Sequence, residues 1–437
     1  MRVAFLHPNM GIGGAEQLVV NLAMSCKKLG WYVKIFTPAY DPSRALEQVK
    51  NGTIDLEVRG SFFPKKLFGK FHAFCEYIRM TLAAIYLILF GGDYDLVIVD
   101  QIPLPLPLLN IRFKTFFYCH YPDKLLCTQR ASLLKKIYRF FIDSIEEITM
   151  WFAHEIAVNS RYTLGIYRNN FKILSKCRRH LPQVIYPCID PADYQKSNFA
   201  KVQLLQINGI AESMKDKDLN AVRVMASLNR FEHKKNVVLA LKAYLKFMDF
   251  LKNKKSNAEA EKHILIIAGG YDNEVPECRE SLEQLQALVQ SSEWSKNIFM
   301  LKNISGEERA ILLNTANVMM YTPKNEHFGI VPVEGMLSGA MVICHKSGGP
   351  LESVKDGVTG YLLDNEDEEK WAEKLMIFFD DKSNFDEQGM NNRIIKERLK
   401  KHVVDNFSVD KMMRDMKELW ENRLGGKVVG ESETKKD

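Results

Sequence analysis

Residues 318–344 read VMMYTPKNEHFGIVPVEGMLSGAMVIC. The segment begins and ends with a short apolar run, Val318–Tyr321 and 341–344, and both runs have the length and composition of buried strands. Between them we expect a helix that begins at Pro332, because proline is favoured in the first helical turn. A strand, a helix and a second strand in this order form the repeating unit of a parallel sheet covered by helices.

The same alternation recurs on both sides of this segment. In the first half we expect a helix at about 15–29 and strands at 3–6, 32–37, 96–100, 116–120 and 155–159. In the second half we expect a helix at 237–247 and strands at 222–227, 263–268 and 298–301. Two such series predict an α/β protein with two Rossmann-like, doubly wound domains that face a cleft at the carboxyl ends of their strands.

The length of 437 residues also favours two domains over one hydrophobic core. Residues 189–219 are polar and lack a clear period, as expected of a connection. We therefore predict a first, acceptor-binding domain at 1–200, a linker at 201–219, a second, nucleotide-sugar-binding domain at 220–405, and a C-terminal helix with a polar tail at 406–437.

The composition narrows the class of protein. Lys and Arg exceed Asp and Glu by 60 to 54, a formal charge of +6, which does not indicate a nucleic-acid partner but leaves room for a local basic patch. Eight cysteines are scattered without CxxC spacing. A zinc site or a disulfide framework is therefore not expected, and a reducing compartment fits better.

Residues 61–90, SFFPKKLFGKFHAFCEYIRMTLAAIYLILF, raise the question of a membrane. The uninterrupted apolar run covers 80–90 and as a helix would span only ~16 Å, about half of a ~30 Å hydrocarbon core. Lys65, Lys66 and Lys70 are interleaved with phenylalanines, which is typical of a helix lying on an anionic membrane surface. The alternative is a core helix with a solvated basic rim.

The segment quoted first also carries two carboxylates eight residues apart, Glu326 and Glu334. The first lies in the loop after the strand, and the second in the first turn of the expected helix. We expect Gly329 to turn the backbone so that its N–H group and those of Ile330 and Val331 can bind a diphosphate. A carboxylate can accept two sugar hydroxyls, so the pattern indicates a nucleotide-sugar site. The alternative is that Glu334 only complements the positive end of the helix.

Two further loops follow strands of the second half. Arg230 and Lys235 lie in NRFEHKKN (229–236), just before a helix, and can clamp the two phosphates of a diphosphate. The alternative is a solvated run of charges. The loop SGGPLE (347–352) follows the next strand after the carboxylates, and we expect it to close the same pocket.

The first half offers two candidate contacts. Gly13 and Gly14 open a helix after the first strand, so the backbone could approach a ligand closely there, or could simply make a tight turn. The sequence departs from GxGxxG, which argues against a dinucleotide site. His120, at the end of a strand, could bond the transferred sugar or the acceptor. The alternative is that His120 is structural, as a lone histidine more often is. We assign its neighbour Asp123 to the acceptor.

Together these motifs resemble those of the retaining family-4 glycosyltransferases of the GT-B fold. The specific parts are the E-x7-E, the R-x4-K and the S-G-G-x-x-E, and the resemblance runs over most of the chain. Within that family, four segments resemble the eukaryotic α-1,3/1,6-mannosyltransferases of dolichol-linked oligosaccharide assembly most: FFYCHYPDKLL (116–126), VNSRYT (158–163), NRFEHKKN (229–236) and NEHFGIVPVEGM (325–336).

The resemblance implies transfer of mannose from GDP-mannose to Man-GlcNAc2-PP-dolichol, in an α-1,3 and then an α-1,6 linkage with retention, for protein N-glycosylation. It implies that Arg230 and Lys235 bind the donor diphosphate, that Glu334 binds the ribose, and that Glu326 and His120 contact the mannose at the reaction centre. The Gly13–Gly14 turn would approach the donor.

The resemblance further implies that no metal is required, that the partners are a lipid-linked oligosaccharide and a membrane surface rather than nucleic acid, and that the chain acts on the cytosolic face of the endoplasmic reticulum. A complex with other cytosolic-face mannosyltransferases of the pathway is compatible with it. The residues alone leave the choice between GDP and UDP open.

Three alternatives stay open on the sequence. The chain could be a GT-B glycosyltransferase that uses another nucleotide sugar or lipid-linked acceptor. It could be an inactive relative that serves as a membrane-associated assembly partner, although the presence of all the motif residues speaks against this. It could also be a nucleotide-dependent oxidoreductase, against which the missing dinucleotide fingerprint weighs.

Overall fold

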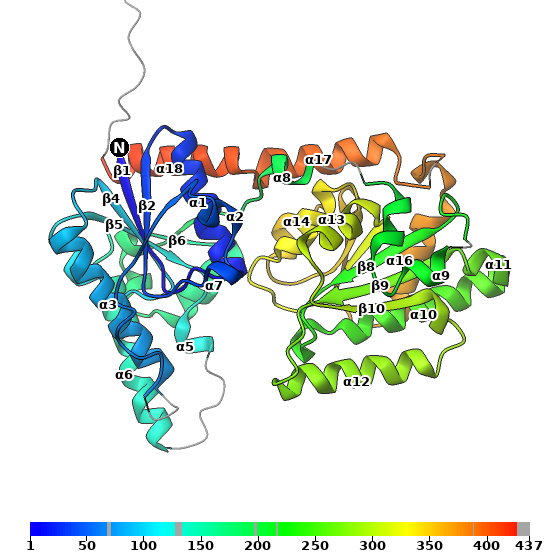
Figure 1. Ribbon diagram of the computed structural model, residues 1–437, viewed down its shortest axis with the longest axis horizontal. Coiled ribbons are helices and arrows are strands. Elements are labelled where there is room, and N and C mark those ends of the chain that lie inside the picture. Colours follow the sequence, from blue (N-terminus) through cyan, green and yellow to red (C-terminus); the bar gives the residue numbers. More distant parts are fainter. Residues whose placement is uncertain (68–70, 127–132, 196–198, 216, 388, 426–437) are drawn as a thin grey trace, which may run out of the picture. The chain divides into compact units, whose positions relative to one another are not determined.

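The computed structural model describes residues 1–67, 71–126, 133–195, 199–215, 217–387 and 389–425 (Figure 1). The chain divides into two compact units: unit 1 comprises Met1–Ile189 and Val409–Asp437, and unit 2 comprises Asp190–Ser408. The division differs from the expected boundary at residue 200, because the chain enters unit 2 at Asp190 and its last helix returns to unit 1. Lys70, Cys127 and the polar tail from residue 426 lie outside the described residues.

Unit 1 is built on a seven-stranded sheet in the order β3-β2-β1-β4-β5-β6-β7, in which all neighbouring strands are parallel. In that order the strands are Asp55–Val58, Tyr32–Thr37, Arg2–Leu6, Leu96–Asp100, Lys114–Cys119, Glu155–Val158 and Gln183–Val184. Its helices are α1 (Gly14–Lys28), α2 (Glu47–Lys50), α3 (His72–Phe90), α4 (Leu106–Leu109), α5 (Asp123–Leu126), α6 (Leu133–Met150), α7 (Arg161–Asn170) and α18 (Val409–Asn422).

The two faces of the unit 1 sheet carry separate hydrophobic cores, as the alternation of side chains along a strand requires. On β1, Val3 and Phe5 enter the core that α1 and α18 cover, whereas Ala4 and Leu6 enter the core that α3 covers. Helix α18 therefore belongs to the core of unit 1, and its Trp420 packs edge-on against Trp31 with ring centroids 6.3 Å apart.

Unit 2 contains a six-stranded parallel sheet in the order β10-β9-β8-β11-β12-β13. In that order the strands are Ile298–Lys302, His263–Gly269, Arg223–Leu228, Val318–Tyr321, Met341–His345 and Gly360–Leu363. Its helices are α8 (Pro191–Gln195), α9 (Ala211–Met214), α10 (Val237–Lys254), α11 (Asn257–Ala260), α12 (Pro276–Gln290), α13 (Gly306–Thr315), α14 (Ile330–Leu337), α15 (Pro350–Ser353), α16 (Glu368–Asp380) and α17 (Arg393–Phe407).

The segment expected to be a linker is instead packed into unit 2. Residues 199–215 form the 3-10 helix η4 (Lys201–Gln206) and α9, and Leu204, Ile207, Ile210 and Met214 are fully buried. These apolar residues are spaced by three or four, so the segment buries one face although its composition is polar overall.

The predicted α/β class with two parallel sheets is confirmed. Within each unit every strand is preceded or followed by helical segments, as Figure 1 shows for β8 to β11 with α10, α12 and α13. In a parallel sheet the loops after the strands gather at one edge, and most of the candidate residues lie in those loops.

Candidate functional site

The loop between β11 and α14 turns at Gly329. This residue has a left-handed backbone, φ 78°, and an added Cβ would lie 3.0 Å from the Tyr321 ring, so only glycine fits without strain. Helix α14 begins at Ile330, and no side chain among the described residues caps its first turn. The predicted start at Pro332 is thus two residues late, and Glu334 lies in the second turn rather than the first.

Glu326 forms an ion pair with Lys235, which comes from the loop after β8. The Thr322 hydroxyl, at the end of β11, donates to the Lys235 carbonyl at 2.7 Å and so ties the two loops together. Burial alone would raise the pKa of the Glu326 carboxyl, but the Lys235 ammonium, with His327 and Tyr321, holds it below its usual range. Glu326 is therefore an anion at neutral pH, with its charge balanced by Lys235.

Glu334 is buried, and each of its carboxylate oxygens has a protein partner. The Tyr194 hydroxyl, from α8, donates to Oε1 at 2.6 Å, and the Arg309 guanidinium, from α13, forms an ion pair with Oε2. Because each carboxylate oxygen can accept a second hydrogen bond, two acceptor positions remain for sugar hydroxyls. The contacts place Glu334 in a side-chain network, so a charge interaction with the start of α14 is not its main role.

The loop after β12 packs directly against the Glu326 loop. The Gly349 amide donates to the Glu326 carbonyl at 2.8 Å, and Ser347 accepts from the Asn325 amide at 2.8 Å. An added Cβ at Gly348 would lie 2.2 Å from the Glu326 carbonyl oxygen. The two glycines therefore allow a close backbone contact that holds the Glu326 loop in place.

Arg230 is less tightly held than Lys235. Its guanidinium pairs with Glu232 at 2.7 Å, and 61% of its side chain is exposed. The loop itself is fixed by Gly269 at the end of β9, where an added Cβ would lie 1.8 Å from the Asn229 carbonyl oxygen. The structure thus brings Lys235 to Glu326 and leaves Arg230 at the rim of the same loop.

In unit 1, His120 lies at the end of β5 and is part of a chain of three side chains. Its Nε2 lies 2.9 Å from Oδ2 of Asp100, and Oδ1 of Asp100 lies 2.7 Å from Nδ1 of His7. Burial would raise the pKa of Asp100, but the two imidazoles lower it, so Asp100 is an anion. The Asn159 side chain fixes the His120 backbone by donating to its carbonyl at 2.9 Å.

Asp123, predicted from the sequence to contact the acceptor, makes its contacts within unit 1. Its carboxylate pairs with Arg139 of α6 at 3.2 Å, and its amide donates to the Glu146 carboxylate at 2.7 Å. Burial, together with the neighbouring Asp123 charge, raises the pKa of Glu146 to about 7. Asp123 therefore anchors α5 to α6, and the partner that orients His120 is Asp100.

Gly13 and Gly14 begin α1 as predicted. Gly13 precedes the helix in an extended conformation, and an added Cβ would meet the Glu16 carboxylate. Around Gly14 an added Cβ would find nothing within 4 Å, so the backbone is open there. The geometry is compatible with the close approach of a ligand.

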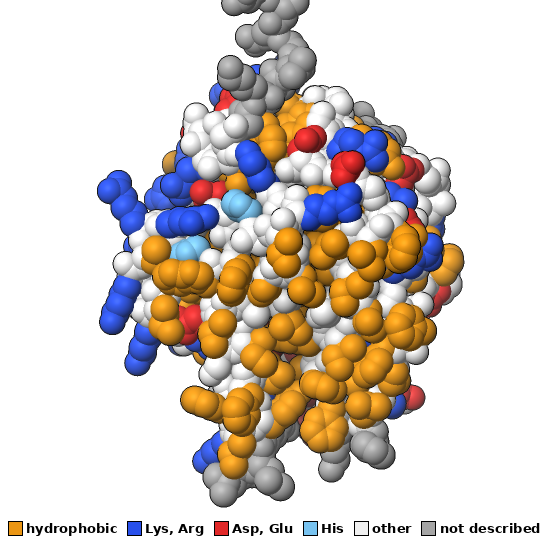
Figure 2. All heavy atoms as spheres, turned by 90° about the vertical axis from the view of Figure 1, so that its left-hand side faces the viewer, with side chains coloured by type: hydrophobic (Ala, Val, Ile, Leu, Met, Phe, Trp, Pro, Cys, Tyr) orange, Lys and Arg blue, Asp and Glu red, His pale blue; other side chains and the backbone are white. Residues whose placement is uncertain are grey.

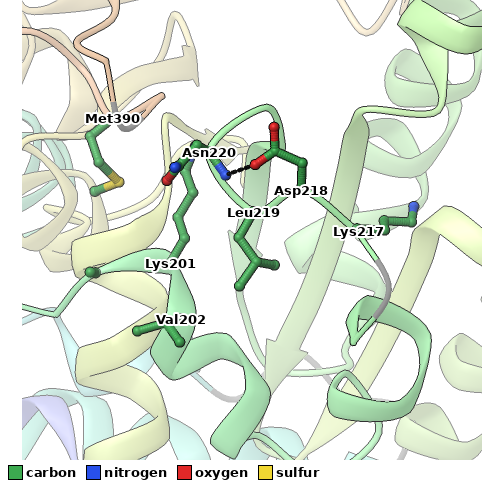
Figure 3. Close-up of a pocket in the computed structure, with 8 residues that line it drawn as sticks. Lys201, Val202, Lys217, Asp218, Leu219, Asn220 and Met390 are labelled. Carbon is green, nitrogen blue, oxygen red and sulfur yellow. Dashed lines mark hydrogen bonds between the residues drawn. The ribbon is translucent and has the colours of Figure 1, made fainter.

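Two further observations concern a metal site and a cavity that lies away from these loops. Across the residues that the structure describes, no three His, Cys, Asp or Glu side chains lie close enough together to hold a metal ion. A cavity of about 520 Å³ lies instead beside Lys201, Asn220 and Met390, before β8 begins (Figure 3). The Lys201 ammonium is buried there and donates to the Gly389 carbonyl at 2.6 Å, and burial lowers its pKa to about 7.

The outer sides of α3 and α6 carry many exposed apolar residues. By length and composition α3 is the one helix in the described parts of the chain that could cross a membrane, but its inner side is buried, and Arg79 on that side pairs with Glu76 at 2.6 Å. Figure 2 shows hydrophobic side chains gathered over the lower part of this face of unit 1. We define the α3–α6 face by its exposed members: Phe71, Phe74, Ile85, Leu89, Phe90, Ile137, Phe140, Phe141, Ile148, Trp151 and Phe152.

Sequence reasoning missed several of these residues. Asp100 and His7 each follow or end a buried strand, so the criterion that singled out His120 could have found them. Tyr194 and Arg309 lie 140 and 25 residues from Glu334, and no local spacing links them to it.

Two family profiles cover most of the chain. "Glycosyltransferase Family 4" matches residues 12–193, and "Glycosyl transferases group 1" matches residues 211–401. Among solved structures, sucrose-phosphate synthase from Thermosynechococcus elongatus (TM-score 0.68, 18% identity, 97% of this chain and 99% of that chain) and the catalytic domain of starch synthase IV from Arabidopsis thaliana (TM-score 0.70, 14% identity, 98% and 100%) share the fold. The expected GT-B fold is confirmed.

Full-length relatives are more similar in sequence. The alpha-1,3/1,6-mannosyltransferase ALG2 of Dictyostelium discoideum is 37% identical over 93% of this chain and 95% of its own length. The ALG2 proteins of Rhizomucor pusillus (37%, over 94% of this chain and 89% of the relative) and Homo sapiens (37%, over 83% of both) are similar to the same degree. The chain belongs to the ALG2 family of alpha-1,3/1,6-mannosyltransferases.

Proposed function

We propose that this mannosyltransferase takes mannose from GDP-mannose and adds it to Man-GlcNAc2-PP-dolichol, first in an α-1,3 and then in an α-1,6 linkage. The observation that carries the proposal is the pairing of Lys235 with Glu326 beside the uncapped start of α14, with Glu334 one turn further along that helix. A cation, free backbone N–H groups and two carboxylates with acceptor capacity are the groups that a nucleoside diphosphate sugar needs.

In this proposal the donor diphosphate lies against the amides of Gly329, Ile330 and Val331 and against the Lys235 ammonium. The first N–H groups of a helix lack intrahelical partners and carry the positive end of the helix dipole, so they favour an anion. Lys235 has three N–H donors, of which Glu326 uses one. The remaining two can reach phosphate oxygens, and Arg230 would add a contact from the rim.

The two carboxylates would each bind a different sugar of the donor. Glu334, held by Tyr194 and Arg309, would accept hydrogen bonds from the ribose hydroxyls. Glu326 would accept from hydroxyls of the mannose, and its pairing with Lys235 would limit its repulsion of the diphosphate. In unit 1, His120 would contact the mannose or the acceptor at the reaction centre, and the open backbone at Gly14 would face the donor.

We propose a front-face reaction with retention. The bond between the anomeric carbon and the phosphate oxygen breaks, and the acceptor hydroxyl forms the new bond on the same face. The leaving phosphate takes the hydroxyl proton, while Lys235 and the α14 amides stabilise the negative charge that develops on GDP. No protein nucleophile is needed in this scheme.

The acceptor carries a dolichol chain, so the enzyme must work at a membrane surface, which we propose is the cytosolic side of the endoplasmic reticulum. The α3–α6 face supports this, because exposed apolar patches of this kind on a folded protein mark interaction sites. Lys65 and Lys66 are exposed shortly before α3, where they would meet anionic headgroups.

A binding experiment separates this proposal from its rivals. Titration calorimetry of the purified chain with GDP, UDP and NAD should show binding of GDP in clear preference to the other two. Preference for UDP would indicate a glycosyltransferase with another donor, and preference for NAD an oxidoreductase. Binding of none of the three would favour the inactive assembly partner.

A further inference from the structure

Three side chains at the ends of three neighbouring strands of unit 1 form one hydrogen-bonded chain. His7 follows β1, Asp100 ends β4 and His120 follows β5, and β4 lies between the other two strands in the sheet. The distances are 2.7 Å from His7 Nδ1 to Asp100 Oδ1 and 2.9 Å from Asp100 Oδ2 to His120 Nε2. The register of the parallel sheet therefore brings one carboxylate between two imidazoles.

The chain runs from the core to the surface. His7 and Asp100 are buried, whereas the His120 side chain is 20% exposed. A carboxylate anion can only accept hydrogen bonds, so the His120 nitrogen that meets Asp100 must be Nε2–H. In the neutral ring the other nitrogen, Nδ1, then carries a lone pair and is the one able to accept from a substrate hydroxyl.

His7 is fully buried, and its imidazole interacts with the Asp100 carboxylate and with the Asn9 backbone. Burial opposes a charge on His7, yet Asp100, helped by Glu16, raises its pKa above the usual value. The raised pKa favours the His7 cation beside the Asp100 anion.

The backbone at Asp100 is also unusual. The next residue, Gln101, has a left-handed conformation with φ 61°, and the Ile102 amide closes a tight turn onto the Asp100 carbonyl at 2.7 Å. Such a conformation costs energy in a residue other than glycine, and it persists where the surroundings fix it. The turn ends β4 directly at Asp100 and fixes the backbone where the chain leaves the sheet.

We propose that Asp100 and His7 are positioning residues for His120, which together hold its ring with Nε2 on Asp100 and leave Nδ1 for the reacting sugar. The inference rests on the proposed role of His120 in mannosyl transfer. Asp100 sets the ring orientation and the tautomer, and His7 holds the Asp100 carboxylate in place through the 2.7 Å contact.

A double-mutant cycle tests this. Asp100→Asn should lower kcat by about ten- to a hundredfold in the wild-type background, the range found for partners that orient metal-ligating histidines, with the KM for GDP-mannose changed only a few-fold. In a His120→Gln background the same substitution should have almost no further effect. Thr37→Val, which removes a buried hydroxyl at the end of neighbouring β2, is the matched control and should leave kcat unchanged.

His7→Gln provides the second readout. Loss of the His7–Asp100 contact should lower kcat, but less than Asp100→Asn does, with the KM for GDP-mannose changed only a few-fold, and the effect should disappear in the Asp100→Asn background. The proposal would be overturned if Asp100→Asn lowered kcat equally in the wild-type and His120→Gln backgrounds, or if it left the kcat of the folded protein unchanged.

A third readout does not depend on turnover. In protein labelled with ¹⁵N-histidine, with the signal assigned through His120→Gln, we expect His120 protonated at Nε2 and not at Nδ1 at neutral pH. The opposite tautomer would overturn the proposal even if a variant fails to fold. Failure of the wild-type chain to turn over GDP-mannose would instead contradict the proposed function, and the tautomer would still be measured.

Discussion

The Lys235 ammonium forms an ion pair with the Glu326 carboxylate, although 91 residues separate them in the sequence. The contact joins the loop after β8 to the loop after β11, two neighbouring strands of the unit 2 sheet. It brings together the R-x4-K and the E-x7-E motifs, which the sequence shows only as separate patterns. It also balances the carboxylate charge at the place where a diphosphate is proposed to bind.

The first prediction concerns the two cations. Lys235→Ala should weaken GDP binding more than Arg230→Ala, because it removes a phosphate contact and also leaves Glu326 without its counter-charge. A charge-assisted hydrogen bond contributes roughly 1.5–3 kcal/mol, whereas Arg230 is mostly exposed and should contribute less. Calorimetric titration of both variants with GDP measures the difference. Unchanged affinity for GDP in both folded variants would mean that this loop does not bind the diphosphate.

The second prediction separates the two carboxylates. Glu334→Gln should mainly raise the KM for GDP-mannose, because the ribose does not react and its contact is similar in the ground and transition states. Glu326→Gln should mainly lower kcat, because the mannose ring gains positive charge as the phosphate leaves. Steady-state kinetics over GDP-mannose concentration give both constants. The reverse pattern would exchange the two roles, and changes below a few-fold in both variants would mean that the motif is not the donor site.

The third prediction concerns the residues that hold Glu334. Tyr194→Phe removes the 2.6 Å hydrogen bond and little else, so we expect a several-fold rise in the KM for GDP-mannose at nearly constant kcat. Arg309→Gln should have a larger effect, because it leaves the buried carboxylate without its ion pair. In a Glu334→Gln background the Tyr194→Phe effect should largely disappear. If it persists in full, Tyr194 acts on something other than Glu334.

The fourth prediction concerns the α3–α6 face. Replacing Phe140 and Phe141 of α6 with serine should reduce flotation with liposomes that contain anionic lipid, while activity on an acceptor with a short, soluble tail remains. The matched control replaces the exposed Ile377 and Ile394 of unit 2 with serine, and we expect its flotation to be unchanged. If both double variants float with the liposomes as the wild type does, the α3–α6 face does not bind the membrane.

The central strands were predictable, and of the four edge strands only β10 (Ile298–Lys302) was predicted. Tyr32–Thr37, Leu96–Asp100 and Val318–Tyr321 match their expected bounds, because buried strands are short apolar runs. The strands that were not predicted, β3, β7 and β13, all lie at sheet edges. An edge strand has one unpaired side and is less buried, so its sequence carries little signal.

The same distinction applies to the site. Glu326, Glu334 and Lys235 stand in local motifs whose spacing indicates a diphosphate sugar. Tyr194 and Arg309 contact Glu334 only through the packing of α8 and α13. The partner of His120 is Asp100, which ends an adjacent strand and which the sequence pattern did not single out. Side chains that meet across strands or helices depend on register and packing, which the local pattern does not encode.

The most direct measurement of the central claim is the product formed by the purified chain from GDP-mannose and a synthetic Man-GlcNAc2 diphosphate lipid, followed by mass and linkage analysis. We predict two successive additions, of one α-1,3- and one α-1,6-linked mannose, and no transfer from UDP-glucose. A Glu326→Gln sample serves as the control for activity from a contaminant. An unchanged acceptor in the presence of the wild-type protein, or a product of other linkage, would contradict the account.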